Sequence, residues 1–96
     1  MNEMMHCRMA QLDDLDIIFK IEKNIFKEPW TKESIHDELN KSKNKLNIIA
    51  EIDGKIIGYF FSHFFGNEAH ILNFVIDVPF QHKGNGKVFL NKIINQ

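Results

Sequence analysis

The stretch NFVIDVPFQHKGNGK, residues 73–87, decides how the rest of this sequence is interpreted. Its apolar start predicts a strand, and the apolar residues after Lys87 recur at helical spacing, so a strand runs through a turn into a helix. Gly84 and Gly86 let the backbone turn tightly and approach a ligand without Cβ atoms in the way. N–H groups at the start of a helix lack intrahelical partners and attract anions. With His82 as a donor and two lysines nearby, the turn predicts a cradle for a phosphate-bearing cofactor.

Two other glycine-loop motifs fail on detail. A Walker P-loop needs a glycine five residues before the Gly-Lys pair and a Ser or Thr after it, but positions 81 and 88 hold Gln and Val. The dinucleotide fingerprint needs three glycines in a first βαβ unit, and only two are present here, after the fourth predicted strand. A plain strand-to-helix turn that uses glycine for its geometry alone remains the alternative to the cradle.

Upstream of the turn, apolar periodicity and turn signals predict the order β-α-α-β-β-β-α. Asp53-Gly54 predicts a type I′ hairpin, because this turn needs positive φ at both central positions. The aromatic run 55–64 is nearly continuous, so we expect a strand buried on both faces. Pro29 ends the first helix, and Thr31 caps the second. The expected strands cover 5–10, 46–52, 55–64 and 69–77, and the expected helices cover 14–26, 32–41 and the segment after Gly86.

Two side chains in the first half of the chain allow more than one interpretation. Glu22 lies on the apolar face of the first expected helix, four residues from both Ile18 and Phe26. Its head either extends to water at the helix edge or faces a substrate cleft. Trp30, which precedes the cap of the second helix, is interpreted as a packing anchor, with a groove-lining role as the alternative.

Composition limits the class of protein. The 96 residues suffice for one domain, and 44% hydrophobic with 26% charged residues is typical of a globular chain. A net charge of −1 gives no general reason to bind nucleic acid or an anionic membrane, so neither is expected as a partner. No metal site is expected either. Cys7 is the single cysteine, so no intramolecular disulfide forms. With no apolar run of signal or membrane-helix length, the sequence predicts a soluble, cytoplasmic protein.

The strand 73–77 followed by Gln81-x-x-Gly84-x-Gly86 resembles the acetyl-CoA-binding motif of the GNAT N-acetyltransferases. That motif is a strand, then Gln/Arg-x-x-Gly-x-Gly/Ala, then a helix. Within the superfamily, four further features resemble the bacterial ribosomal-protein-alanine N-acetyltransferases, which acetylate the N-terminal alanine of a small-subunit ribosomal protein. These features are Ile21-Glu22, Phe26, Pro29-Trp30 and Asn73. One local departure is Asp77-Val78-Pro79, in which the proline stands one place later than the family has it.

The resemblance implies a mixed α/β (α+β) fold of GNAT type, with acetyl-CoA as co-substrate and a protein N-terminus, most simply a ribosomal-protein alanine, as acceptor. The backbone of Phe74, Val75 and Ile76 would pair with the pantetheine arm. The diphosphate would be held by His82, Lys83, Gly84, Asn85, Gly86 and Lys87. Two alternatives are a non-catalytic acyl-CoA-binding fragment and a GNAT enzyme that acts on another amine.

The resemblance also places the catalytic base and acid beyond Gln96, so no catalytic residue is assigned. Tyr59 does not match the family's acid, and the side chains of Glu22, Glu68, His63 and His70 are interpreted as surface or strand-face groups. Residues 1–96 are therefore expected to form a single, C-terminally incomplete N-acetyltransferase domain, arising as a truncated reading frame, a gene fragment or one half of a split protein. Its fourth strand would keep an open apolar edge that invites pairing with another chain.

Overall fold

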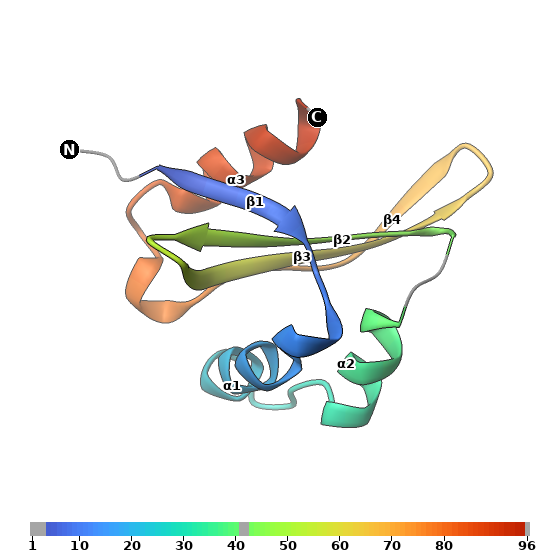
Figure 1. The fold of residues 1–96 in the computed structure, drawn as a ribbon, viewed down its shortest axis with the longest axis horizontal. Coiled ribbons are helices and arrows are strands. Elements are labelled where there is room, and N and C mark those ends of the chain that lie inside the picture. Colours follow the sequence, from blue (N-terminus) through green and yellow to red (C-terminus); the bar gives the residue numbers. More distant parts are fainter. Residues whose placement is uncertain (1–3, 41–42, 96) are drawn as a thin grey trace.

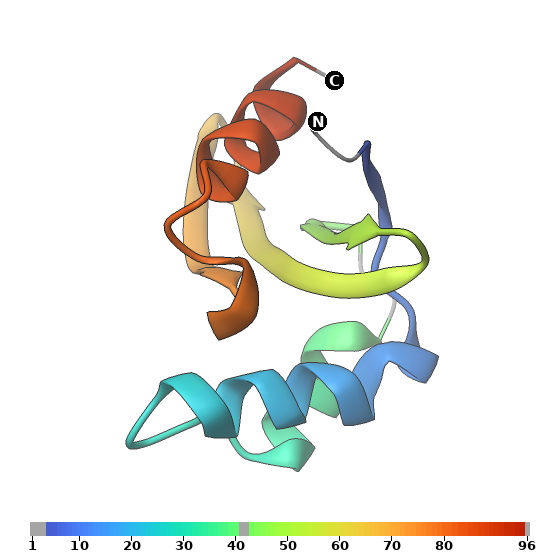
Figure 2. The same cartoon turned by 90° about the vertical axis from the view of Figure 1, so that its left-hand side faces the viewer.

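The structure, a computed structural model that describes residues 4–40 and 43–95, is a four-stranded antiparallel sheet between two helical layers. The strands are β1 (Met5–Met9), β2 (Lys45–Ile52), β3 (Lys55–Phe65) and β4 (Glu68–Ile76), and they lie side by side in that order. The helices are α1 (Leu15–Ile25), α2 (Lys32–Leu39) and α3 (Asn85–Ile94), with short 3-10 helices η1 (Leu12–Asp14) and η2 (Val78–Phe80). Helices α1 and α2 cover one face of the sheet, and α3 covers the other (Figures 1 and 2).

The predicted order of elements is confirmed, with most boundaries within one residue of those expected. The first helix stops at Ile25, and Phe26 takes an extended backbone and is 39% exposed, so its predicted place on the inward face is wrong. The predicted end of the second helix, residue 41, lies outside the described residues. Thr31 caps α2 as expected, because its side-chain oxygen accepts a hydrogen bond from the Ser34 N–H at 3.0 Å.

The β2–β3 turn has the conformation that its sequence predicts. Asp53 has φ of 53° and Gly54 has φ of 76°, so both central residues lie in the left-handed region that a type I′ turn requires. The turn sets a register in which Ile52 faces Lys55. Residues 57–62 of β3 are all buried, which confirms the middle of the predicted strand as covered on both faces. Phe64 is 38% exposed, so the expected burial over 55–64 is wrong at its end, where the β3–β4 hairpin extends beyond the helices (Figure 1).

The core has one cluster on each face of β3. Ile18, Ile35 and Phe61 belong to the cluster under α1 and α2, while Phe60 and Phe89 belong to the cluster under α3. Because α3 has Phe89 as its only buried residue in the described chain, that helix rests on a small contact. The two clusters hold β3 and β4 in place, and the strand-to-helix turn follows directly from β4.

The first helical segment is tied to β1 by a charged group. Arg8 donates to both carboxylate oxygens of Asp14, at 2.9 and 2.8 Å, and to Glu51 at 3.0 Å. Burial alone would raise the pKa of Asp14, but the hydrogen bonds from Arg8 and from the Gln11 N–H lower it. Asp14 therefore stays ionised and fixes the start of α1 against the sheet.

Strand β4 is an edge strand with apolar side chains in solvent. Its hairpin with β3 extends beyond the helices (Figure 1). Ile71, Leu72 and Phe74 are 61%, 40% and 39% exposed. Within residues 4–40 and 43–95, no strand pairs with the outer edge of β4, so its outward backbone groups are open to a ligand or another chain.

Candidate cofactor-binding site

The segment between β4 and α3 is fixed by short-range hydrogen bonds. Asp77 accepts the Val78 N–H on its side chain at 2.9 Å and starts η2, which uses the displaced Pro79 in its first turn. The Gln81 side chain then donates to the Ile76 carbonyl at 2.8 Å. The displaced proline thus lies within a turn of 3-10 helix, and the Gln81 side chain ties the end of that turn to the end of β4.

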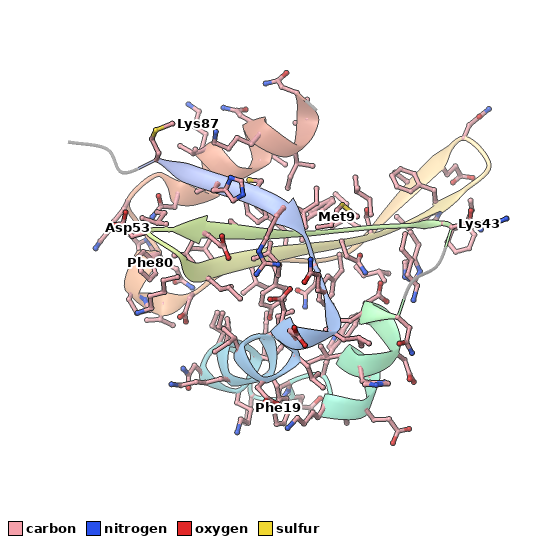
Figure 3. The ribbon with its side chains drawn as sticks, in the orientation of Figure 1. Met9, Phe19, Lys43, Asp53, Phe80 and Lys87 are labelled. Carbon is pink, nitrogen blue, oxygen red and sulfur yellow. The ribbon has the colours of Figure 1, made fainter. Side chains whose placement is uncertain are left out.

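The turn itself depends on left-handed backbone at two positions. His82 has φ of 61° and Gly84 has φ of 82°, and Gly84 is the N-cap of α3. The side chain of Asn85 donates to the Phe80 carbonyl at 2.9 Å and so stabilises the turn, while its backbone N–H stays open. Phe80 lies at the same end of the sheet as Asp53 (Figure 3), and Lys55 Nζ sits 5.5 Å from the centre of its ring.

The backbone N–H groups of this turn form an open donor surface. The first α3 hydrogen bond runs from the Val88 N–H to the Gly84 carbonyl at 3.1 Å. In the part of the chain that the structure describes, the N–H groups of residues 82–87 have no protein acceptor. The structure thus brings all six predicted diphosphate contacts, residues 82–87, to the start of one ten-residue helix, where the helix dipole favours an anion.

Gly84 and Gly86 differ in backbone conformation and in the space around them. Gly84 needs its positive φ, so the backbone alone explains it. Gly86 lies in the first turn of α3 without positive φ, and a Cβ there would meet only Ile76 Cγ1 at 3.8 Å, an ordinary contact. A helical glycine is less favourable than alanine by about 0.5–1 kcal/mol, and no contact inside the described protein offsets that cost. Geometry alone therefore accounts for Gly84 and leaves Gly86 unexplained.

The free edge of β4 presents alternate backbone groups. The Asp77 N–H donates to the Ile57 carbonyl at 2.7 Å, and Tyr59 faces Val75 in the register. In an antiparallel ladder, hydrogen-bonded and non-hydrogen-bonded pairs alternate, so Val75 turns its N–H and C=O toward β3. Phe74 and Ile76 turn theirs toward the open edge, beside the turn that precedes α3.

The sequence model of the Acetyltransferase (GNAT) family matches residues 15–96 of this chain. The chain belongs to the GNAT acetyltransferase family. Members of this family use acetyl-CoA as the acetyl donor. The order of elements and the strand–turn–helix segment agree with that membership.

Similar proteins include ribosomal-protein acetyltransferases. A Bacillus subtilis (strain 168) protein named "putative ribosomal protein bS18-alanine N-acetyltransferase" is 28% identical over 87 residues, which are 91% of this GNAT chain and 58% of the relative. The ribosomal-protein-S18-alanine N-acetyltransferase of Escherichia coli superposes with a TM-score of 0.85 at 23% identity, over 96% of this chain and 58% of that one. The PaiA N-acetyltransferase of Thermoplasma acidophilum, solved with coenzyme A, superposes with a TM-score of 0.79 at 20% identity, over 96% of this chain and 70% of that one. The chain thus spans 58% of the length of its curated relative.

Glu22 of the GNAT chain occupies neither of the places expected for it. Its side chain does not extend to water, because the residue is only 1% exposed, and it does not face a cleft. Oε1 accepts the Trp30 N–H at 3.0 Å, and Oε2 accepts the Asn73 amide at 3.0 Å and the Tyr59 hydroxyl. The helical spacing identified the unusual carboxylate, but its partners on β3 and β4 could not be found from spacing.

Tyr59 is fully buried and belongs to this network. Burial and, next, the hydrogen bond to Glu22 raise its pKa, so its hydroxyl stays protonated and engaged. Such a group does not donate a proton to a ligand at the surface. The sequence-based view that Tyr59 is not the family's acid agrees with its position.

The other polar candidates lie on strand faces, away from the glycine turn. His63 on β3 contacts both carboxylate oxygens of the buried Glu38 at 3.0 Å. Glu68 and His70 face solvent on β4, where His70 Nε2 lies 3.7 Å from Glu68 Oε2. Among residues 4–40 and 43–95, no group of three His, Cys, Asp or Glu residues has the geometry to hold a metal ion. No helix in these ranges has the length and apolar character that crossing a membrane requires.

Proposed function

We propose that this GNAT chain binds acetyl-CoA between the turn before α3 and the open edge of β4, and that it serves the transfer of the acetyl group to a protein N-terminal amine. The observation that carries the binding proposal is Gly86. Its missing Cβ is required neither by φ nor by packing within the described chain. A ligand that approaches the first turn of α3 closely supplies the missing reason.

The residues present suit the two polar parts of the cofactor. The open N–H groups of residues 82–87 would hold the diphosphate, and the exposed side chains of Lys83 and Lys87 add positive charge (Figure 3 labels Lys87). The backbone groups of Phe74 and Ile76 at the free edge would pair with the amide-bearing arm, as an added strand does. We leave Val75 out of that pairing because its backbone groups face β3. When bound, acetyl-CoA supplies an activated acetyl thioester.

We propose the N-terminal alanine of a ribosomal protein as the acceptor. The support is the name of the 28% identical relative from Bacillus subtilis, together with the residues around Glu22 and Trp30. A different amine remains the alternative acceptor, since substrate choice is set by site details that a shared fold does not determine. We place the activity in the cytoplasm, where a lone thiol such as Cys7 stays reduced.

The binding proposal is tested by titrating the protein with acetyl-CoA in a calorimeter. Gly86→Glu puts a side chain and a negative charge where the diphosphate would lie, so we expect at least a ten-fold loss of affinity, about 1.4 kcal/mol. Asn91→Glu, which adds the same charge at an exposed position later on α3, is the matched control and should bind like the wild type. Equal affinities for both variants, or no binding by the wild type at millimolar acetyl-CoA, would refute the site.

Transfer itself is measured with labelled acetyl-CoA and a peptide that starts with alanine. Acetylation of the peptide's N-terminus by the purified chain supports the enzyme. Binding without transfer supports the alternative, a non-catalytic acyl-CoA-binding fragment. The same assay with a lysine-bearing peptide whose N-terminus is blocked separates the two acceptor classes.

A further inference from the structure

Glu22 is a buried carboxylate that connects three separate parts of the fold. It lies on α1 and accepts from Trp30 in the α1–α2 loop, Tyr59 on β3 and Asn73 on β4. Tyr59 and Asn73 are 37 and 51 residues away along the chain. No Lys, Arg or His of the described residues pairs with it, so its charge is stabilised by neutral donors alone.

Burying an unpaired carboxylate is costly, so this arrangement needs a reason beyond packing. Both oxygens of Glu22 are used, Oε1 by the Trp30 N–H and Oε2 by the other two donors. A glutamine of the same shape has one acceptor oxygen and would turn an NH₂ group toward one of these donors. Only a carboxylate satisfies the loop and the two strands together.

The network lies beside the position expected for the acetyl end of the cofactor. The diphosphate cradle is at the C-terminal end of β4, so the arm would run back along β4 from Ile76 past Phe74. A strand rises about 3.3 Å per residue, so the contacts from Ile76 to Phe74 account for roughly 7 Å of the arm. The next residue in that direction is Asn73, whose amide donates to Glu22 at 3.0 Å.

The same carboxylate holds the loop that carries Trp30. The Trp30 N–H is bonded to Glu22 at 3.0 Å, and its ring packs on Phe61 with centroids 5.8 Å apart. We propose that Glu22 is a positioning residue that fixes the α1–α2 loop, residues 26–31, beside the acetyl end of the bound cofactor, where an acceptor amine must arrive. This inference rests on the proposed function, because it takes the direction of the arm from the cofactor site.

Trp30 is the only tryptophan in the chain, so its fluorescence reports on this loop directly. In the wild type we expect acetyl-CoA and CoA to give different Trp30 emission at saturation, because they differ only at the acetyl end. Glu22→Gln should abolish that difference and increase quenching of Trp30 by acrylamide. Its acetyl-CoA affinity should stay within about three-fold of wild type, since the cradle is untouched.

The matched control is Glu28→Gln, which makes the same substitution at an exposed position of the same loop. It should keep the wild-type emission difference. If Glu22→Gln fails to fold by circular dichroism, Asn73→Ser is used instead, because it detaches β4 from Glu22 and leaves the Trp30 N–H bond in place. We expect that variant to bind acetyl-CoA and to lose the emission difference, because Glu22 and its loop are then no longer bonded to the strand along which the arm runs. A retained difference would overturn the positioning role.

The outcomes separate this inference from the proposed function. A wild type that does not bind acetyl-CoA refutes the cofactor site itself. A wild type that binds, with Glu22→Gln still distinguishing acetyl-CoA from CoA, overturns the positioning role alone. Where the chain transfers acetyl, Glu22→Gln should raise KM for the peptide by about ten-fold with little change in kcat, as expected when a ground-state contact is lost. A fall in kcat at unchanged KM would contradict the inference.

Discussion

Gly84 and Gly86 stand two residues apart and are held to glycine for different physical reasons. The first has φ of 82°, which side chains rarely adopt, and the second has neither positive φ nor a close neighbour. Within the described residues, neither φ nor packing requires glycine at position 86. Unfolding and binding experiments on the pair can therefore separate the contribution of the turn's shape from that of its ligand.

We predict opposite effects of alanine at these two positions on the free energy of unfolding. Gly84→Ala should destabilise the protein by about 1 kcal/mol, because alanine is strained at positive φ. Gly86→Ala should stabilise it by about 0.5 kcal/mol, since alanine is the better helix former, and should weaken acetyl-CoA binding. Urea unfolding with calorimetry on the same samples checks both. Stabilisation by Gly86→Ala together with undiminished binding would remove the main support for the cofactor site.

Sequence reasoning at the residue scale predicted which residues gather at the turn before α3, but it did not predict the contacts of Glu22. The donors and glycines of residues 82–87 were predicted because they lie within one turn, where spacing determines geometry. Glu22 was misplaced because helical spacing shows only which face a side chain is on. Its donors Tyr59 and Asn73 come from strands far along the chain, and no local pattern reports such contacts.

Gly58 on β3 has no room for a side chain beside β4. A Cβ there would lie 2.4 Å from the Val75 carbonyl oxygen and 2.9 Å from Ile76 Cδ1. Both neighbours belong to the part of β4 that leads into the turn. Because the nearest atom is backbone, the strand itself would have to move to make room.

Gly58→Ala should therefore destabilise the protein by about 1–3 kcal/mol, in the range of other overpacking changes. Gly86→Ala is the control, because its new Cβ makes only an ordinary contact at 3.8 Å. The free energies of unfolding in urea are compared. A Gly58→Ala protein as stable as the control would mean that β4 moves easily and does not hold the turn rigidly.

At the element scale the sequence was informative wherever local chemistry sets the backbone. The Asp53-Gly54 turn and the Thr31 cap formed as predicted, because both depend on residues within three positions of each other. The 3-10 helix η2 was not foreseen, although its proline was noticed as displaced. The Gln81 side chain bonds the Ile76 carbonyl across η2, and the sequence pattern does not reveal such a side-chain contact.

In residues 4–40 and 43–95 the whole molecule is one sheet between two helical layers, and the proposed ligand uses the outer edge of the edge strand β4. The backbone groups of neighbouring residues on β4 point in opposite directions. The N–H and C=O groups of Phe74 and Ile76 point to the open edge, whereas those of Val75 point to β3. A cofactor that pairs with this edge must therefore form hydrogen bonds with the backbone of alternate residues. A cofactor that only touches the side chains would not produce this alternation.

We predict that saturating acetyl-CoA slows amide hydrogen exchange at Phe74, Ile76 or both relative to its effect at Val75, and slows it at residues 83–87. The physical reason is that new hydrogen bonds form only where N–H groups are open. Exchange is followed by NMR on the free and the bound protein. CoA without acetyl should give the same pattern, since the arm is common to both. Equal slowing of all amides of β4 would indicate a general gain in stability and would contradict edge pairing.

The turn before α3 has a further property that bears on how the site arises. Its two side-chain bonds, from Gln81 to Ile76 and from Asn85 to Phe80, each close a loop of only five residues. Short loops cost little chain entropy, so the cradle can take shape early in folding and can persist when distant parts of the chain loosen. The network around Glu22, by contrast, joins residues up to 51 positions apart, so it forms only once the helix and both strands have come together.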